Sequence, residues 1–182
     1  GEQIDLRTAI AESCDVYFYD LAYHLGIDRI HTFLQEFGLG EKTGIDSTGE
    51  QSGLLPSREW KKRSRRQPWF PGETLNIGIG QGYMLATPLQ LAVATATVAN
   101  RGVLVKPRLV RSNSAIEQSV EASSEEQEFK EAGEVTSTVS AKHWQLVTQA
   151  MEDVVHAPKG TASAVGRNLQ YQMAGKTGTA QV

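Results

Sequence analysis

The strongest constraint on the fold is a long stretch, residues 38–80, that is rich in glycine, proline and serine and lies between two groups of helical patterns. Loops of this length are uncommon inside a compact domain, and those that occur are usually functional or packed over a groove. We therefore predict a long connection with little regular structure. By size alone, the 182 residues of the chain correspond to one domain.

Helical patterns precede this stretch. Apolar residues recur at helical spacing over residues 6–22, with a break near residues 12–15. A second helix is expected over residues 28–37, with Asp28 as its N-cap and Gly38 as the left-handed residue that ends it.

Further elements are predicted after the stretch. Thr87-Pro88 is typical of a helix start, and the helix is expected to run through Leu89–Asn100. Ser140 is the expected N-cap of another helix. Residues Val103–Val110 alternate as in a strand, and residues 169–182 form a second extended run.

Composition excludes several kinds of site. The net charge of −3 gives no electrostatic reason to expect nucleic acid, and no apolar stretch is long enough to cross a membrane. Cys14 is the only cysteine and the four histidines are scattered, so we expect no internal disulfide, no metal and no cofactor. Residues 111–134 hold seven glutamates and predict an acidic, flexible insertion.

A basic cluster lies inside the glycine-rich stretch. It is either a solvated face or a contact to an anionic polymer or partner. Its members are Arg58, Lys61, Lys62, Arg63, Arg65 and Arg66. The neighbouring Trp60, Trp69 and Phe70 are expected to anchor the stretch onto the body of the protein.

The first candidate for chemistry is the S-x-D motif, Ser13-Cys14-Asp15, at the break between two helical patterns. A hydroxyl and a carboxylate on one turn can both face a cleft, where the serine relays a proton and the carboxylate orients a lysine. The alternative is an ordinary helix N-cap. We expect Cys14 to be a small buried side chain on the helix, since no histidine is near it in sequence to activate it as a nucleophile.

The second candidate is the K-T-G-T motif, residues 176–179. A cation and a hydroxyl along one strand edge suit a substrate carboxylate, and the N–H of Thr179 can face a developing oxyanion. Gly178 has no side chain, so another backbone can approach it closely. The alternative is an exposed strand end.

A glycine-rich run, Gly78 to Gly82, is the third feature. It matches neither the P-loop nor the dinucleotide-binding pattern, so a phosphate site is not expected. We predict a tight backbone crossing beneath an active site instead.

The three features, in this order and together with Thr87-Pro88-Leu89-Gln90, resemble the penicillin-binding transpeptidases over nearly the whole chain. Residues 43–46 and 52–61 are similar to the elongation-type, class B members from rod-shaped Gram-negative bacteria. So is Asp15, where division-type relatives usually carry asparagine. The resemblance implies an α+β fold of the serine β-lactamase/transpeptidase type, with a helical lobe and part of an antiparallel sheet.

The resemblance also implies roles for the motif residues. Ser13 would pass a proton to the leaving amine, Asp15 would pair with a catalytic lysine, and Lys176 would hold Ser13 and raise the positive potential of the site. Thr179 N–H would form half of the oxyanion hole. The implied substrate-binding residues are Thr177, Gly178 and Thr179.

The implied reaction is acyl transfer on D-Ala-D-Ala stem peptides of peptidoglycan, through a serine acyl-enzyme that β-lactams also form. The implied partner is a membrane glycosyltransferase of the elongation machinery. The implied location is the periplasmic face of the bacterial inner membrane.

The sequence departs from the family pattern in one respect. The nucleophile motif S-x-x-K is absent, because none of the eight lysines has a serine three positions before it. We therefore expect residues 1–182 to be a partial transpeptidase domain that lacks the nucleophile-bearing segment, the C-terminal strands, the N-terminal domain and the membrane anchor. Such a chain alone is predicted to be inactive. A serine β-lactamase, a D,D-carboxypeptidase and a non-catalytic penicillin-recognising scaffold remain alternatives.

Overall fold

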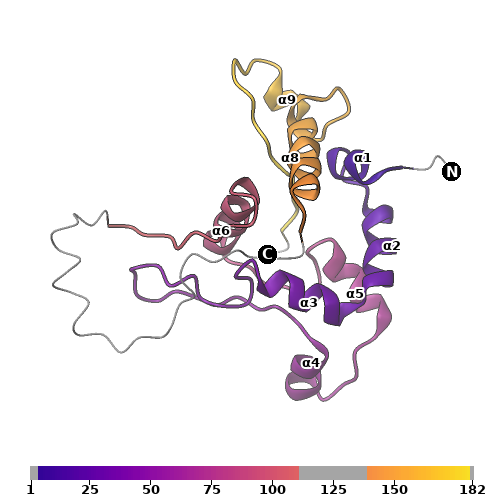
Figure 1. Ribbon diagram of the computed structural model, residues 1–182. Coiled ribbons are helices and arrows are strands. Elements are labelled where there is room, and N and C mark those ends of the chain that lie inside the picture. The colour runs from indigo at the N-terminus through magenta and orange to yellow at the C-terminus, as the bar shows by residue number, and fades with distance from the viewer. Residues whose placement is uncertain (1–3, 111–138, 181–182) are drawn as a thin grey trace.

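The computed structural model describes residues 4–110 and 139–180, which form a mostly helical assembly (Figure 1). No helix among these residues has the length and apolar character needed to cross a membrane. The acidic insertion predicted for residues 111–134 lies outside the described residues. The helices are α1 (Leu6–Ala11), α2 (Asp15–Leu25), α3 (Ile27–Gln35), α4 (Arg58–Arg65), α5 (Pro71–Gly78), α6 (Pro88–Ala99), α8 (Ala141–His156) and α9 (Ser163–Gly166).

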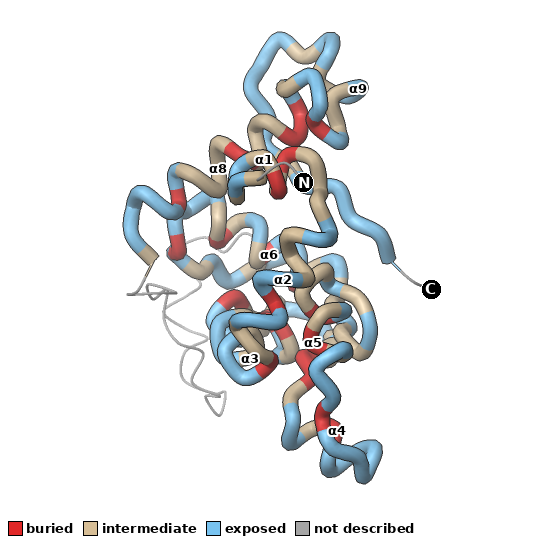
Figure 2. Tube along the Cα trace, turned by 90° about the vertical axis from the view of Figure 1, so that its right-hand side faces the viewer, coloured by how far each residue is buried: buried red, intermediate tan, exposed pale blue. Residues whose placement is uncertain are grey.

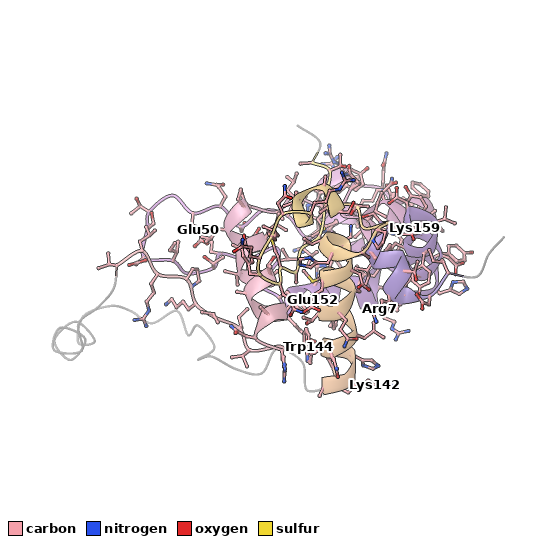
Figure 3. The ribbon with its side chains drawn as sticks, turned by 90° about the horizontal axis from the view of Figure 1, so that it is seen from above. Arg7, Glu50, Lys142, Trp144, Glu152 and Lys159 are labelled. Carbon is pink, nitrogen blue, oxygen red and sulfur yellow. The ribbon has the colours of Figure 1, made fainter. Side chains whose placement is uncertain are left out.

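Helix α8 is the support on which α1, α6 and α9 pack. The contact between α1 and α8 is close because Ala9 and Ala150 are small and fully buried. Arg7 of α1 pairs with Asp153 of α8 at the edge of this contact, where the view from above shows Arg7 beside α8 (Figure 3). This packing fixes the end of α1, the residues that lead into Ser13.

A second core joins α2, α3 and α5. Its buried residues are Ile27, Trp69 and Ile77. Gly78, at the end of α5, lies so close to α2 that an added Cβ would be 2.5 Å from the Cβ of Ala22. Buried residues lie where α1 meets α8 and again where α3 meets α5 (Figure 2).

The prediction of little regular structure over residues 38–80 is wrong in its second half, which contains α4 and α5. Local capping explains both helices. At the start of α4, the Ser57 side chain accepts a hydrogen bond from Trp60 N. At the start of α5, whose first residue is Pro71, the Glu73 side chain accepts one from Phe70 N. Glycine and proline here stand at helix ends and turns, so their abundance does not exclude helix.

The basic cluster lies on and just after α4, at the periphery of the molecule in both views (Figures 1 and 2). Most of its side chains are exposed, as expected of a solvated face, and Arg58 pairs with Asp28 at 2.9 Å. Lys61 is the exception, because it is buried. Trp69 is an anchor as predicted, and the Trp60 ring packs on Tyr83, whereas Phe70 is 52% exposed.

Helix α6 confirms the prediction from Thr87 and Pro88. Thr87 caps it, because its side-chain hydroxyl accepts a hydrogen bond from Gln90 N while Gln90 Oε1 accepts one from Thr87 N. The fully buried Gln90 amide also donates to the carbonyls of Glu41 and Ser52, at 2.6 and 2.8 Å. Residues 41–53 are thereby fastened to the start of α6.

The predictions for the ends of the other helices are confirmed in part. Ser140 precedes α8 as expected, although its side chain makes no capping bond. The predicted N-cap Asp28 lies inside the first turn of α3, whose N-cap is Gly26. Gly38 has a φ of +76° and is left-handed as predicted.

The predicted strands Val103–Val110 and 169–182 are not formed within the described residues, where the one bridge with both partners described is Leu54 with Leu85. A strand requires a ladder of backbone hydrogen bonds to a neighbour, and within the described residues these segments have only isolated ones, such as that from Gly175 N to the Met151 carbonyl at 3.0 Å. Residues 103–110 are instead held by Asp46, which accepts from Leu109 N at 2.6 Å and Val110 N at 3.0 Å.

Candidate active site

The motif residues from both ends of the chain line one cleft of about 860 Å³. Ser13 and Asp15 come from the α1–α2 junction, and the K-T-G-T residues come from the extended segment after α9. The cleft is lined by Ser13, Asp15, Phe18, Tyr19, Asn76, Gly78, Ile79, Gln81, Gly82, Lys176, Thr177, Gly178 and Thr179. The structure therefore brings together every residue that the sequence analysis proposed for catalysis or substrate binding.

Ser13 has a left-handed backbone with a φ of +53°, which is uncommon for a residue other than glycine. Its N–H donates to the carbonyl of Ile10 and the N–H of Cys14 donates to that of Ala9, so the end of α1 imposes this conformation. The side chain makes no cap for α2. The N-cap alternative for Ser13 is therefore wrong, and its hydroxyl faces the cleft.

Lys176 extends across the cleft and donates a hydrogen bond to Ser13 Oγ. Its Nζ also donates to the carbonyl of Thr177 at 3.0 Å. Partial burial lowers the pKa of Lys176 below its ordinary value, and the nearby Asp15 carboxylate opposes this by raising it. A lysine in this state gives up its proton more readily than a free one.

Thr177 links Ser13 to a residue that the sequence analysis did not nominate. Its Oγ1 is 3.3 Å from Ser13 Oγ and 2.8 Å from Thr161 Oγ1. Thr161 lies in the turn after α8, and a single threonine following a glycine carries no recognisable pattern. Only the fold reveals that it meets a residue 16 positions away.

Gln81 holds the far end of the motif. Its side-chain amide donates to the carbonyl of Thr179 at 2.6 Å. This bond fixes the peptide plane that follows Thr179. The prediction of a close backbone approach at Gly178 is wrong for the described residues, because nothing lies within 4 Å of an added Cβ there. Its surroundings are open cleft.

The glycine-rich run forms the floor of the cleft, as predicted. It follows the C-terminal end of α5, whereas a phosphate cradle requires the N-terminal end of a helix. Besides its contact with Ala22, an added Cβ at Gly78 would meet the Phe18 carbonyl at 3.1 Å. The crossing of α5 beneath α2 therefore requires a residue without a side chain.

Cys14 is half-buried and stands at the N-cap position of α2. The prediction of a buried residue on the helix is wrong, because the chain turns at this position to present Ser13. The described residues contain no group of side chains that can hold a metal ion.

The arrangement suits proton transfer next to an anion site. A lysine with lowered pKa, a serine hydroxyl and a threonine hydroxyl form a continuous hydrogen-bonded path along one wall. The ammonium and the exposed hydroxyls also favour a carboxylate.

Comparison with known proteins gives a consistent family. The chain matches the penicillin binding protein transpeptidase domain over residues 1–182. It is 39% identical over 181 residues to the peptidoglycan D,D-transpeptidase MrdA of Salmonella typhimurium, a match that covers 98% of this chain and 28% of that relative.

Two solved structures are similar as well. Pseudomonas aeruginosa PBP2 in complex with WCK 5153 is 46% identical with a TM-score of 0.84, covering 98% of this chain and 39% of that one. PBP2 of Helicobacter pylori in complex with MreC is 35% identical with a TM-score of 0.84, covering 98% of this chain and 31% of that one. The chain thus spans well under half the length of each of these proteins.

Proposed function

The chain belongs to the penicillin binding protein transpeptidase domain family and shares its fold, and from this premise we propose that the longer protein carrying it is a serine-type peptidoglycan D,D-transpeptidase of cell-wall elongation. Its substrates are D-Ala-D-Ala stem peptides, and β-lactams acylate the same site. The proposal is supported by the name of the Salmonella relative and by the hydrogen bond from Lys176 to Ser13 across the cleft.

That hydrogen bond is the observation that carries the proposal. In acyl transfer from a serine nucleophile, the leaving amine must receive a proton as the bond to it breaks. Ser13 Oγ supplies that proton and recovers another from Lys176 Nζ, with which it is already hydrogen-bonded. The lowered pKa of Lys176 eases this exchange because the protonated amine is then a stronger acid than that of a free lysine.

The terminal carboxylate of the stem peptide binds at the Thr177 and Thr179 hydroxyls, with Gly178 leaving room between them. Thr179 N–H donates to the developing oxyanion. Gln81 supports this role, because its hydrogen bond to the Thr179 carbonyl restrains the backbone of Thr179, whose N–H is the donor.

We propose that the nucleophile, which the 182 residues lack as an S-x-x-K motif, is supplied by another part of the same domain. Asp15 pairs with the lysine of that motif in this proposal. The extended segment that ends in residues 176–180 serves as one strand of the family's antiparallel sheet. The 182-residue chain by itself is then not acylated by penicillin.

For partners and location we propose a membrane glycosyltransferase of the elongation machinery and the periplasmic face of the inner membrane. The Helicobacter PBP2 that resembles this chain was found in complex with MreC. Co-purification of the full-length protein with a glycosyltransferase tests the first of these.

The reaction is tested with the full-length protein and a fluorescent penicillin. We expect labelling that survives denaturation, and release of D-Ala from a D-Ala-D-Ala peptide. Replacing Lys176 or Ser13 with alanine removes the proton path, and we expect acylation to slow by about 10²- to 10⁴-fold. Lys159→Ala is the matched control, because that side chain is 83% exposed and lies outside the cleft. Wild-type labelling in both variants would overturn the proposal.

A further inference from the structure

Thr161 is placed behind the cleft rather than in it. It is absent from the residues that line the cleft, yet its hydroxyl is 2.8 Å from the hydroxyl of Thr177, which does line it. This is the shorter of the two hydroxyl contacts of Thr177, since Ser13 Oγ is 3.3 Å away. Thr161 can therefore act on a ligand only through Thr177.

The backbone of Thr161 ties the same residue to the other wall of the site. Its N–H donates to the carbonyl of Ala11 at 3.2 Å, at the C-terminal end of α1 and just before Ser13. One residue thus bonds the segment that presents Ser13 and the segment that presents Thr177. These two bonds hold Thr161 between the two segments.

A threonine hydroxyl has one proton to donate and two lone pairs to accept with. If Thr177 donated its proton to Thr161, none would remain for a carboxylate in the cleft. If Thr161 is the donor, the proton of Thr177 is directed toward Ser13 and the cleft. The direction of the bond between these two hydroxyls therefore decides whether Thr177 can bind an anion.

We propose that Thr161 is a positioning residue that donates to Thr177 and thereby orients the Thr177 hydroxyl toward the carboxylate of the substrate. This inference rests on the proposed function, because it takes the substrate to be a peptide that ends in a free carboxylate. It assigns to Thr161 a share in the selection of that carboxylate. A residue that only supported the fold would have no such selectivity.

The test compares two substrates in the full-length protein, a D-Ala-D-Ala peptide and the same peptide with a C-terminal amide. Thr161→Val removes the hydroxyl at constant shape. We expect the preference for the free acid, expressed as a ratio of kcat/KM values, to fall by about three- to tenfold, as for the loss of one hydrogen bond. Thr161→Ser retains the hydroxyl and should restore the preference.

The control is Thr95→Val, because the Thr95 hydroxyl bonds to the Leu91 carbonyl within α6. That variant should keep the wild-type ratio. An unchanged ratio in Thr161→Val, with wild-type protein that is acylated normally, would overturn the inference alone. Wild-type protein that no penicillin labels would overturn the proposed function. A variant with a lower melting temperature but an unchanged ratio also counts against the inference.

Discussion

The α4–α5 unit (residues 57–78) and the hydroxyl–lysine wall of the cleft (Ser13, Lys176 and Thr177) are both built from polar contacts, but the partners are close in sequence in the first and far apart in the second. In the unit, Lys61 and Glu73 pair over 12 positions, and the helices are capped by their own neighbours. In the cleft wall, Ser13 and Lys176 meet over 163 positions. The first is organised by local caps and a local ion pair, although it also packs on α2 and α3, whereas the second exists only when segments far apart in sequence have come together.

Burial separates the two regions as well. Lys61 is 1% exposed, its Nζ lies 4.4 Å from the centre of the Phe70 ring, and Glu73 neutralises its charge. Lys176 is far less buried than Lys61 and bonds to two neutral oxygens, the Ser13 hydroxyl and the Thr177 carbonyl. A buried lysine paired with a carboxylate has a fixed position, while a lysine whose partners are a hydroxyl and a carbonyl oxygen can lose its proton and regain it. Under the proposed function, the first lysine supports the structure and the second transfers a proton.

The largest expected effect comes from breaking the buried pair. Lys61→Ala leaves the Glu73 carboxylate without its partner, and we expect the free energy of unfolding to fall by about 3 kcal/mol. Denaturant unfolding of the full-length protein measures this. Lys62→Ala is the control on the adjacent, exposed position, with an expected change within about 0.5 kcal/mol. Equal effects of the two changes would mean that the pair does not hold the unit.

The second prediction concerns the point where the two regions meet. Gly78 ends α5 and forms part of the cleft floor. Gly78→Ala places a methyl group 2.5 Å from the Ala22 Cβ, so α5 and α2 must separate, at a cost of about 1–3 kcal/mol. We expect slower penicillin acylation as well, because the floor moves with α5.

Gly72→Ala is the control in the same helix. An added Cβ there meets nothing within 4 Å, so stability should be unchanged or slightly higher. Loss of stability in both variants would show that α5 tolerates no alanine and that the contact with α2 is not the cause.

The separation of contacting residues along the sequence also explains which features could be predicted. The α6 and α8 helices were predictable because Thr87, Pro88 and Ser140 mark their starts within a few residues. The α4 helix had an equally local signal in Ser57, but the glycine and proline content around it favoured a loop. The buried state of Lys61 was not predictable, because it depends on aromatic rings that fold over it.

Within the site, Ser13, Asp15 and Lys176 were nominated because their spacing and order formed a known pattern. Thr161 and the anchoring role of Gln81 were missed for a physical reason. A hydrogen bond between side chains far apart in sequence leaves no periodicity along the chain, and one threonine or glutamine is compatible with any surface. The strands failed for a related reason, since alternation predicts an extended backbone but not the neighbour that completes a ladder.

The smallest expected effect comes from Asp15, which lines the cleft. Asp15 acts on Lys176 through its charge, which raises the pKa of that lysine against the lowering caused by burial. In Asp15→Asn the opposing charge is gone, so the pKa of Lys176 falls further. Lys176 donates the proton in the proposed transfer, so the rate of penicillin acylation falls with pH through this pKa, and the falling limb should move to lower pH in the variant.

The effect is small because Asp15 is exposed, and water and salt screen its charge. Added salt should therefore reduce the difference between wild type and variant. Asp20→Asn, on the same helix with a side chain that is 77% exposed, is the control and should leave the profile unchanged. A limb that moves to higher pH in Asp15→Asn would contradict the sign of the Asp15 charge effect. Identical profiles would mean that Lys176 does not titrate in the rate-limiting step, and the contrast with Lys61 would then rest on burial alone.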